Sequence, residues 1–160
     1  MPSARWRAAA LLLSLAAAAC GGAPESVPPA AAYHDPGFVE AAGFRLRYAL
    51  TLTTDLPADI AGSYGIERRR NLALLALTLE RQDARAGTRV DADALEAEAL
   101  WLTGERHALA LARHDDPGGP TWIAPVEVRH RVPITIEIRA RATPAIPELR
   151  ARLTREFGLD

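Results

Sequence analysis

The sequence predicts an all-β fold, because apolar and polar residues alternate along several of its segments. In the clearest of these, residues 44–53, every second residue from Phe44 onward is large and apolar. In another, residues 134–138, isoleucines alternate with polar residues. Alternation with a period of two is typical of strands that bury one face. The 160-residue chain has one cysteine, so no intramolecular disulfide can form and the fold must rest on a hydrophobic core.

A short helix and an undecided segment follow the first strand. We expect the helix over residues 56–63, opened by Pro57, because proline in a first helical turn loses no needed amide hydrogen. Gly62 and Gly65 limit its length. Residues 71–80 form an apolar run that fits a helix or a strand by pattern alone.

The second half of the chain predicts further strands and turns. Residues 90–95 alternate, and the apolar run 108–113 is closed by a polar turn at residues 114–119. Val126 and Val128 with residues 134–138 predict a hairpin that has charged outer faces and a break at residues 130–133. Residues 146–157 fit either a helical face or a strand.

The first twenty residues predict export from the cytoplasm. Arg5 and Arg7 precede an apolar run, residues 8–19, that stops at Cys20. A charged start, a short apolar stretch and small residues before the cleavage point form a signal peptide, and a cysteine at that place resembles the lipobox of bacterial lipoproteins. An uncleaved membrane helix would need about 20 apolar residues. An ordinary secretory signal cut near Ala19 or Ala23 stays open, because Ala17 stands where lipoboxes usually carry leucine.

A lipobox would make Cys20 the attachment point of acyl chains and anchor the protein in a membrane. Gly21 follows in place of aspartate, which by resemblance to the sorting of Gram-negative lipoproteins favours the outer membrane over the inner. We therefore predict a signal peptide over residues 1–19, a Pro- and Ala-rich tether over residues 20–36 and a folded domain over residues 37–160. The alternative is a soluble periplasmic protein.

The charge of the chain argues against nucleic acid as a partner. The sequence has 19 basic and 20 acidic residues, and every basic residue is arginine. Removal of the signal would take away Arg5 and Arg7, which leaves 17 basic against 20 acidic residues. A chain of this balance has no overall basic field to attract a polyanion.

The segment from Tyr64 to Leu75 is the most distinctive motif. It reads Tyr-Gly-Ile-Glu-Arg-Arg-Arg-Asn-Leu-Ala-Leu-Leu and resembles a segment of DUF4426, a proteobacterial periplasmic family of unknown function. Arg69 and Arg70 stand where that family usually has serine and lysine. The resemblance implies an immunoglobulin-like antiparallel β-sandwich without assigned activity, and it favours a strand for residues 71–80.

Two interpretations of this motif stay open. Its guanidinium groups and an amide beside a turn suit a carboxylate, a phosphate or a sugar acid. In the structural interpretation Tyr64 packs under the loop, Gly65 supplies a permissive backbone angle, Asn71 satisfies turn amides and the arginines are solvated. The candidate residues are Tyr64, Gly65, Arg68, Arg70 and Asn71.

No other pattern indicates catalysis, a cofactor or a metal site. Beyond the signal the serines are Ser26 and Ser63, and neither lies in a nucleophile elbow. His107, His114 and His130 lack a metal-ligand spacing, and we interpret them as solvated or turn histidines. The two tryptophans of the domain, Trp101 and Trp122, fit either a core or a sugar-stacking surface.

The leading functional hypothesis is therefore a non-enzymatic, lipid-anchored domain that binds an envelope protein or another envelope component through its loops or edge strands. The alternative is a small hydrolase, or a binder of an anionic small molecule or sugar, that uses the loop of residues 64–71. A purely structural lipoprotein lies between the two.

Overall fold

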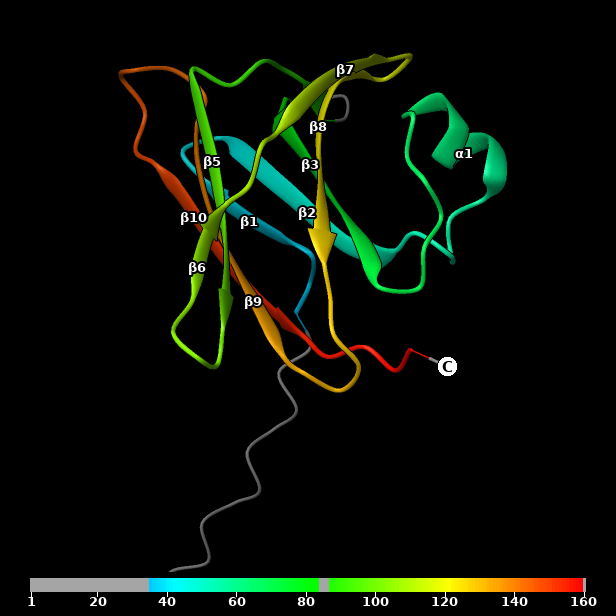
Figure 1. Ribbon diagram of the computed structural model, residues 1–160. Coiled ribbons are helices and arrows are strands. Elements are labelled where there is room, and N and C mark those ends of the chain that lie inside the picture. Colours follow the sequence, from blue (N-terminus) through cyan, green and yellow to red (C-terminus); the bar gives the residue numbers. More distant parts are fainter. Residues whose placement is uncertain (1–34, 84–86, 160) are drawn as a thin grey trace, which may run out of the picture. The chain divides into compact units, whose positions relative to one another are not determined.

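Two antiparallel sheets pack face to face in the computed structural model, which describes residues 35–83 and 87–159 (Figure 1). The first sheet has the order β1-β2-β3-β8-β7, with β4 also paired to β3. Its strands are β1 (Phe38–Ala41), β2 (Phe44–Leu52), β3 (Leu72–Arg81), β4 (Thr88–Arg89), β7 (Ala112–Asp116) and β8 (Gly119–Glu127). The second sheet has the order β10-β9-β5-β6, formed by β5 (Ala94–Trp101), β6 (Arg106–Ala108), β9 (Ile134–Arg141) and β10 (Leu149–Arg155). The predicted immunoglobulin-like β-sandwich is confirmed.

The core lies between the sheets and is built by alternate residues of their strands. From the first sheet, β2 and β3 supply leucines and Tyr48, and from the second sheet β9 supplies three isoleucines. The fully buried large side chains of this core are Leu46, Leu75, Leu77, Leu79, Ile134, Ile136, Ile138, Leu149 and Leu153. Each contributes about 1.5–3 kcal/mol by leaving water, so the core stabilises the fold without a disulfide.

A short helix, α1 (Ala58–Ser63), lies in the connection between β2 and β3, on the side of the first sheet that faces away from the second (Figure 1). Pro57 precedes it with φ −53°, as expected for a proline that opens a helix. Among the described residues, no helix is long and apolar enough to cross a membrane.

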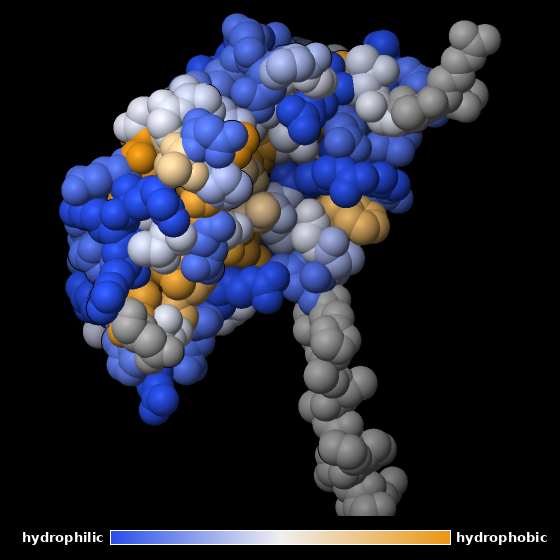
Figure 2. Space-filling view, turned by 90° about the vertical axis from the view of Figure 1, so that its right-hand side faces the viewer, coloured by the Kyte–Doolittle hydropathy of each residue, from blue (hydrophilic) through white to orange (hydrophobic). Residues whose placement is uncertain are grey.

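Some apolar residues are buried outside the core between the sheets. Leu74 and Ile123 point away from the main core by strand alternation, yet both are buried, as is Ala61 of α1. Seen from this side, the surface is largely hydrophilic, with apolar residues gathered between the hydrophilic ones (Figure 2). Leu74, Ile123 and Ala61 are therefore buried apolar residues outside the core cluster between the two sheets.

The structure also decides the two segments that the sequence pattern left open. Residues 71–80 belong to a strand, β3, at the centre of the first sheet, as the family resemblance indicated. Residues 149–155 form β10, in register with β9, and are not helical.

The predicted hairpin of residues 126–138 is wrong. β8 pairs with β3 and β7 in the first sheet, whereas β9 pairs with β5 and β10 in the second. The intervening residues, with Arg131 at φ +52°, carry the chain from one sheet to the other. Alternation reports which face of a strand is buried, but it does not identify the neighbouring strand.

The predicted polar turn at residues 114–119 is also wrong in extent. His114, Asp115 and Asp116 lie in β7, paired with Thr121, Pro120 and Gly119 of β8. β7 is an edge strand, so its polar side chains reach solvent, and a strand of such polar residues is easily mistaken for a turn.

The predicted alternating segment of residues 90–95 is a strand only at its end. Its last two residues belong to β5, whereas Val90 lies outside that strand and donates its N–H to Leu79 O at 2.8 Å.

Candidate ligand-binding cleft

A cleft of about 410 Å³ opens between the edge of β6 and the second half of β8, where the chain crosses from the second sheet to the first. β7 pairs with β8 only as far as Ile123, so the later residues of β8 have no neighbour on that side among the described strands. The lining residues are Asn71, Trp101, Glu105, His107, Ala108, Leu109, Pro125, Val126, Glu127, Val128 and Arg129.

The β5–β6 hairpin positions the aromatic wall of this cleft. Trp101 N–H donates to Glu105 O at 3.1 Å, and the N–H of Gly104, at φ +83°, donates to Trp101 O at 2.9 Å. This tight turn brings His107 edge-on to the half-buried Trp101 ring, with ring centroids 5.2 Å apart. His107 Nε2 lies 2.7 Å from Glu105 Oε1. The hairpin therefore fixes an indole, an imidazole and a carboxylate side by side.

The opposite wall carries polar side chains on a fixed backbone. Val128 N–H donates to Asn71 O at 2.9 Å, which ties the residue before β3 to the residue after β8. The side chain of Asn71 is exposed, as are those of Glu127 and Arg129. No hydrogen bond occupies the Asn71 amide within the part of the chain that the structure describes. The structural interpretation expected the Asn71 side chain to satisfy turn amides. The structure shows no such bond among the described residues.

The chemistry of this cleft suits a hydroxyl-rich ligand. The indole of Trp101 offers an apolar face, while an amide, carboxylates and a guanidinium offer both donors and acceptors around it. A concave site with an apolar surface and a few convergent polar groups is the usual form of a small-ligand site.

The motif residues Tyr64 and Gly65 lie elsewhere, over the outer face of the first sheet. The Tyr64 hydroxyl donates to Asp116 Oδ2 at 2.8 Å, and its ring meets His114 edge-on with centroids 5.1 Å apart. Gly65 has φ +66°, the left-handed angle that favours glycine. These contacts hold the end of the helical connection against β7.

The three arginines of the motif, Arg68, Arg69 and Arg70, have different surroundings. Arg68 donates from Nη2 to Thr54 O at 2.6 Å and from Nε to Thr53 O at 3.3 Å. The buried Thr53 hydroxyl in turn accepts from Arg69 N–H and donates to Arg69 O, both at 2.9 Å. Arg70 faces a small hollow of about 200 Å³ beside Asp55 and Leu159. The motif therefore does not converge on one site: Asn71 faces the cleft, Arg70 another hollow, and Arg68 the backbone.

Sequence reasoning missed the polar cluster beneath Tyr64. Arg89 Nη1 donates to Thr121 Oγ1 at 3.0 Å and lies 3.8 Å from Asp116 Oδ2. Burial alone would raise the pKa of Asp116, but hydrogen bonds from Thr121 and Tyr64 and the charge of Arg89 lower that pKa below its usual value. Burial, together with the bond to Asp116, raises the pKa of Tyr64. The sequence signal that could have found part of this cluster is strand alternation, because His114 and Asp116 lie on one face if residues 114–116 form a strand.

The remaining candidates are dispersed. Trp122 is buried in the core, and His130 Nδ1 accepts from Leu159 N–H at 2.9 Å. Within residues 35–83 and 87–159, no group of three or more histidine, cysteine or acidic side chains could hold a metal ion. Cys20, with the predicted signal and most of the predicted tether, lies outside the described residues.

Comparison with known proteins identifies relatives of the folded domain. The model of DUF4426, a domain of unknown function, matches residues 39–160. None of the curated proteins matches the chain.

Solved structures with the same fold include a DUF4426 family protein of Pseudomonas aeruginosa PAO1, with a TM-score of 0.62 and 18% identity over 77% of this chain and 94% of that one. FetP of uropathogenic Escherichia coli strain F11, expressed in the periplasm, has a TM-score of 0.52 and 9% identity over 74% and 92% of the two chains. A copper-bound variant of FetP has a TM-score of 0.50 and 10% identity over 73% and 92%. At these identities the likeness concerns the fold.

Proposed function

We propose, since this chain belongs to the DUF4426 family of unknown function, that it is a non-enzymatic binding domain of the bacterial cell envelope. It is held at the outer membrane by acyl chains on Cys20, through the part of the predicted tether that precedes Asp35. The leader with its single cysteine supports the anchor, and Gly21 supports the outer membrane. The periplasmic expression of FetP, a neighbour in fold, supports a periplasmic location.

The observation that carries the binding role is the cleft beside Trp101. It joins the distinctive motif, through Asn71, to an aromatic ring and to an imidazole–carboxylate pair. A saccharide is the ligand class that uses all of these groups: its C–H face stacks on the indole, and its hydroxyls bond with the amide and the carboxylates. Envelope glycans are the saccharides within reach of an anchored domain.

The alternative, a hydrolase or an anion binder in the loop of residues 64–71, has less support. Tyr64 is bonded to Asp116, and Arg68 is bonded to the backbone of Thr53 and Thr54. These bonds use the Tyr64 hydroxyl proton and two of the five N–H donors of Arg68, so fewer donors of the loop are left for an anionic ligand.

Titration of the purified protein with soluble oligosaccharides, such as chitotriose and cellotriose, tests this proposal by calorimetry. We expect saturable binding that Trp101→Ala weakens at least about tenfold, because a stacked aromatic ring supplies much of a sugar's binding free energy. Asn71→Ala should also weaken binding, and because the Asn71 side chain is exposed, this change should leave the fold intact. Leu102→Ala is the matched control, since Leu102 is 81% exposed and does not line the cleft. Absence of binding, or binding that neither variant changes, would refute the saccharide site.

A further inference from the structure

The outer face of the second sheet places like charges directly opposite each other at two positions. Glu98 of β5 is paired with Glu137 of β9, and Arg139 of β9 is paired with Arg150 of β10. Like charges at directly opposed positions of an antiparallel pair destabilise a sheet. Each of these pairs therefore needs a compensating charge.

The acidic pair has its compensation within the protein. Arg106 Nη1 lies 3.3 Å from Glu98 Oε2 and 3.7 Å from Glu137 Oε2, so one guanidinium bridges both carboxylates. Arg152 reaches Glu137 from the other side at 3.8 Å. The charges of Glu98 and Glu137 are thus met by arginines on β6 and β10.

The arginine pair has no such bridge. Arg139 reaches toward β5, where its Nη2 lies 3.4 Å from Glu96 and 3.6 Å from Glu98. Arg150 bonds Glu148, two residues earlier in the chain, with 2.6 Å between Nε and Oε2. No described carboxylate lies within ion-pair distance of both guanidinium groups. An anion between them would lower their repulsion.

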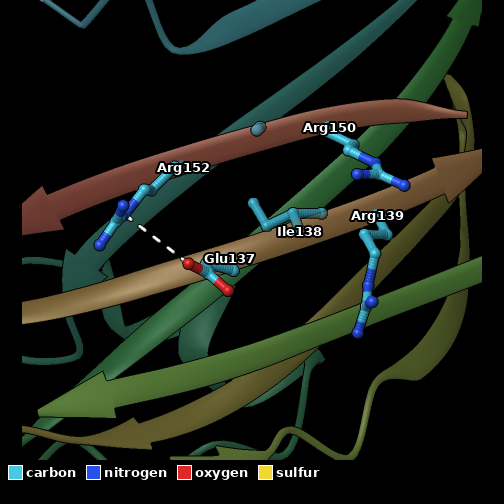
Figure 3. A pocket seen from close by; sticks show the side chains of 6 residues that line it. Glu137, Ile138, Arg139, Arg150 and Arg152 are labelled. Atoms are coloured by element: carbon cyan, nitrogen blue, oxygen red, sulfur yellow. Dashed lines mark ion pairs between the residues drawn. The ribbon is translucent and has the colours of Figure 1, made fainter. Parts of the chain in front are cut away.

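A hollow of about 310 Å³ lies over these two strands (Figure 3). Its middle is open because Ile138 and Ala151, paired across β9 and β10, bury their side chains in the core. Arg139 and Arg150 lie near one end of the hollow, with the Arg139 side chain directed toward β5, while Glu137 and Arg152 form their ion pair near the other end (Figure 3). The side chains of Arg139 and Arg150 are 46% and 77% exposed, so a ligand can reach the N–H donors that their carboxylate partners leave free.

We propose that the Arg139–Arg150 pair binds a phosphate group. A guanidinium presents parallel N–H donors that match two oxygens of a phosphate, and two such groups on neighbouring strands hold one anion from both sides. The phosphate belongs either to a free anion or to a lipid headgroup. The site lies on the outer face of the second sheet and does not depend on the saccharide cleft.

Binding of inorganic phosphate to the full-length protein, followed by calorimetry at constant ionic strength, tests the site. We expect a dissociation constant on the order of 1 mM, as for two exposed charge-assisted contacts. The double change Arg139→Gln with Arg150→Gln should weaken it at least about tenfold. Arg45→Gln with Arg47→Gln removes the same charge from the outer face of the first sheet and should leave binding within about twofold. Arg150→Gln alone, at an exposed position, repeats the test if the double variant unfolds.

Sedimentation with vesicles distinguishes the two sources of the phosphate. Stronger binding to vesicles with anionic phosphatidylglycerol than to phosphatidylcholine vesicles, lost in the Arg139 and Arg150 variant, assigns the site to a headgroup. Phosphate binding without this vesicle preference assigns it to a free anion. The proposal is overturned if the unaltered protein binds neither, or if the variant binds both as the unaltered protein does.

Discussion

At the scale of single residues, Tyr64 shows what a sequence motif can and cannot reveal. Its hydroxyl bonds Asp116, 52 positions later in the chain. The motif identified Tyr64 as important, but nothing in the sequence pointed to Asp116, Arg89 or Thr121 as its surroundings. These residues meet only because β4 and β7–β8 place them on the outer face of one sheet. Long-range pairing of this kind leaves no local pattern.

The Tyr64–Asp116 bond should stabilise the domain measurably. Tyr64→Phe removes the donor to an ionised acceptor, and we expect a loss of about 1–2 kcal/mol in the free energy of unfolding. Urea unfolding measures the difference. Ser63→Ala removes an exposed hydroxyl whose one bond within the described part of the chain goes to Ile60 O, and it should change stability by less than about 0.5 kcal/mol. Equal small effects of both changes would mean that the Tyr64 bond is unimportant.

The same bond predicts a dependence of stability on pH. The folded protein lowers the pKa of Asp116 below the unfolded value of 3.8. Ionised Asp116 therefore contributes to the free energy of unfolding above that pH. This contribution is lost as the pH falls through the folded pKa. Asp116→Asn should therefore destabilise the protein at pH 6, and the difference from the unaltered protein should shrink as the pH falls below about 4. Urea midpoints of the two proteins, measured along this pH series, provide the test. A difference between them that stays constant with pH would contradict a stabilising role for ionised Asp116.

At the scale of elements, the sequence located individual strands better than it identified the strands with which they pair. β2 and β9 were clear, because one face of each is buried and the other is polar. β3 was ambiguous, because both of its faces are largely buried and its pattern is nearly continuous. β7 was taken for a turn, and the first half of β8 was not found, since Pro120 and Pro125 interrupt its pattern. Sheet membership was not predictable where the chain crosses between layers.

The turn between β7 and β8 depends on Gly119. It has φ +107°, and an added Cβ would lie 2.7 Å from Arg89 Cβ. Gly119→Ala should lower the free energy of unfolding by about 2 kcal/mol or more. Gly118→Ala is the matched control, because its Cβ would meet the Arg89 guanidinium carbon at an ordinary 3.5 Å. Thermal unfolding of the two variants measures the contrast, and similar melting temperatures would contradict it.

The connection between β2 and β3 should depend on Arg68 and not on Arg70. Arg68→Ala removes two bonds to Thr53 and Thr54 carbonyls, and we expect a loss of about 1 kcal/mol. Arg70→Ala removes no described hydrogen bond or ion pair and should cost less than about 0.5 kcal/mol. Urea unfolding compares them. An unchanged stability for Arg68→Ala would favour a ligand-binding role for this arginine.

At the scale of the whole molecule, the architecture was predictable and the site was predictable only in parts. Asn71, Trp101 and His107 were each considered from sequence, in three separate arguments. Their meeting in one cleft follows from the crossing between the sheets, which no local pattern encodes. Asp35, inside the predicted tether, accepts from the Tyr48 hydroxyl at 2.7 Å and from Gly37 N–H at 3.0 Å. Folded contacts therefore begin at least as early as Asp35.

The central claim is that the domain works from a membrane surface, because that placement decides which ligands can reach the cleft. The intact mass of the protein extracted from separated inner and outer membranes, beside a Cys20→Ala control, tests it most directly. We expect a mass increase from acyl chains on a chain that begins at Cys20, found in the outer-membrane fraction and absent from the control. An unmodified chain in the soluble periplasmic fraction would contradict the claim and make this an ordinary secreted domain.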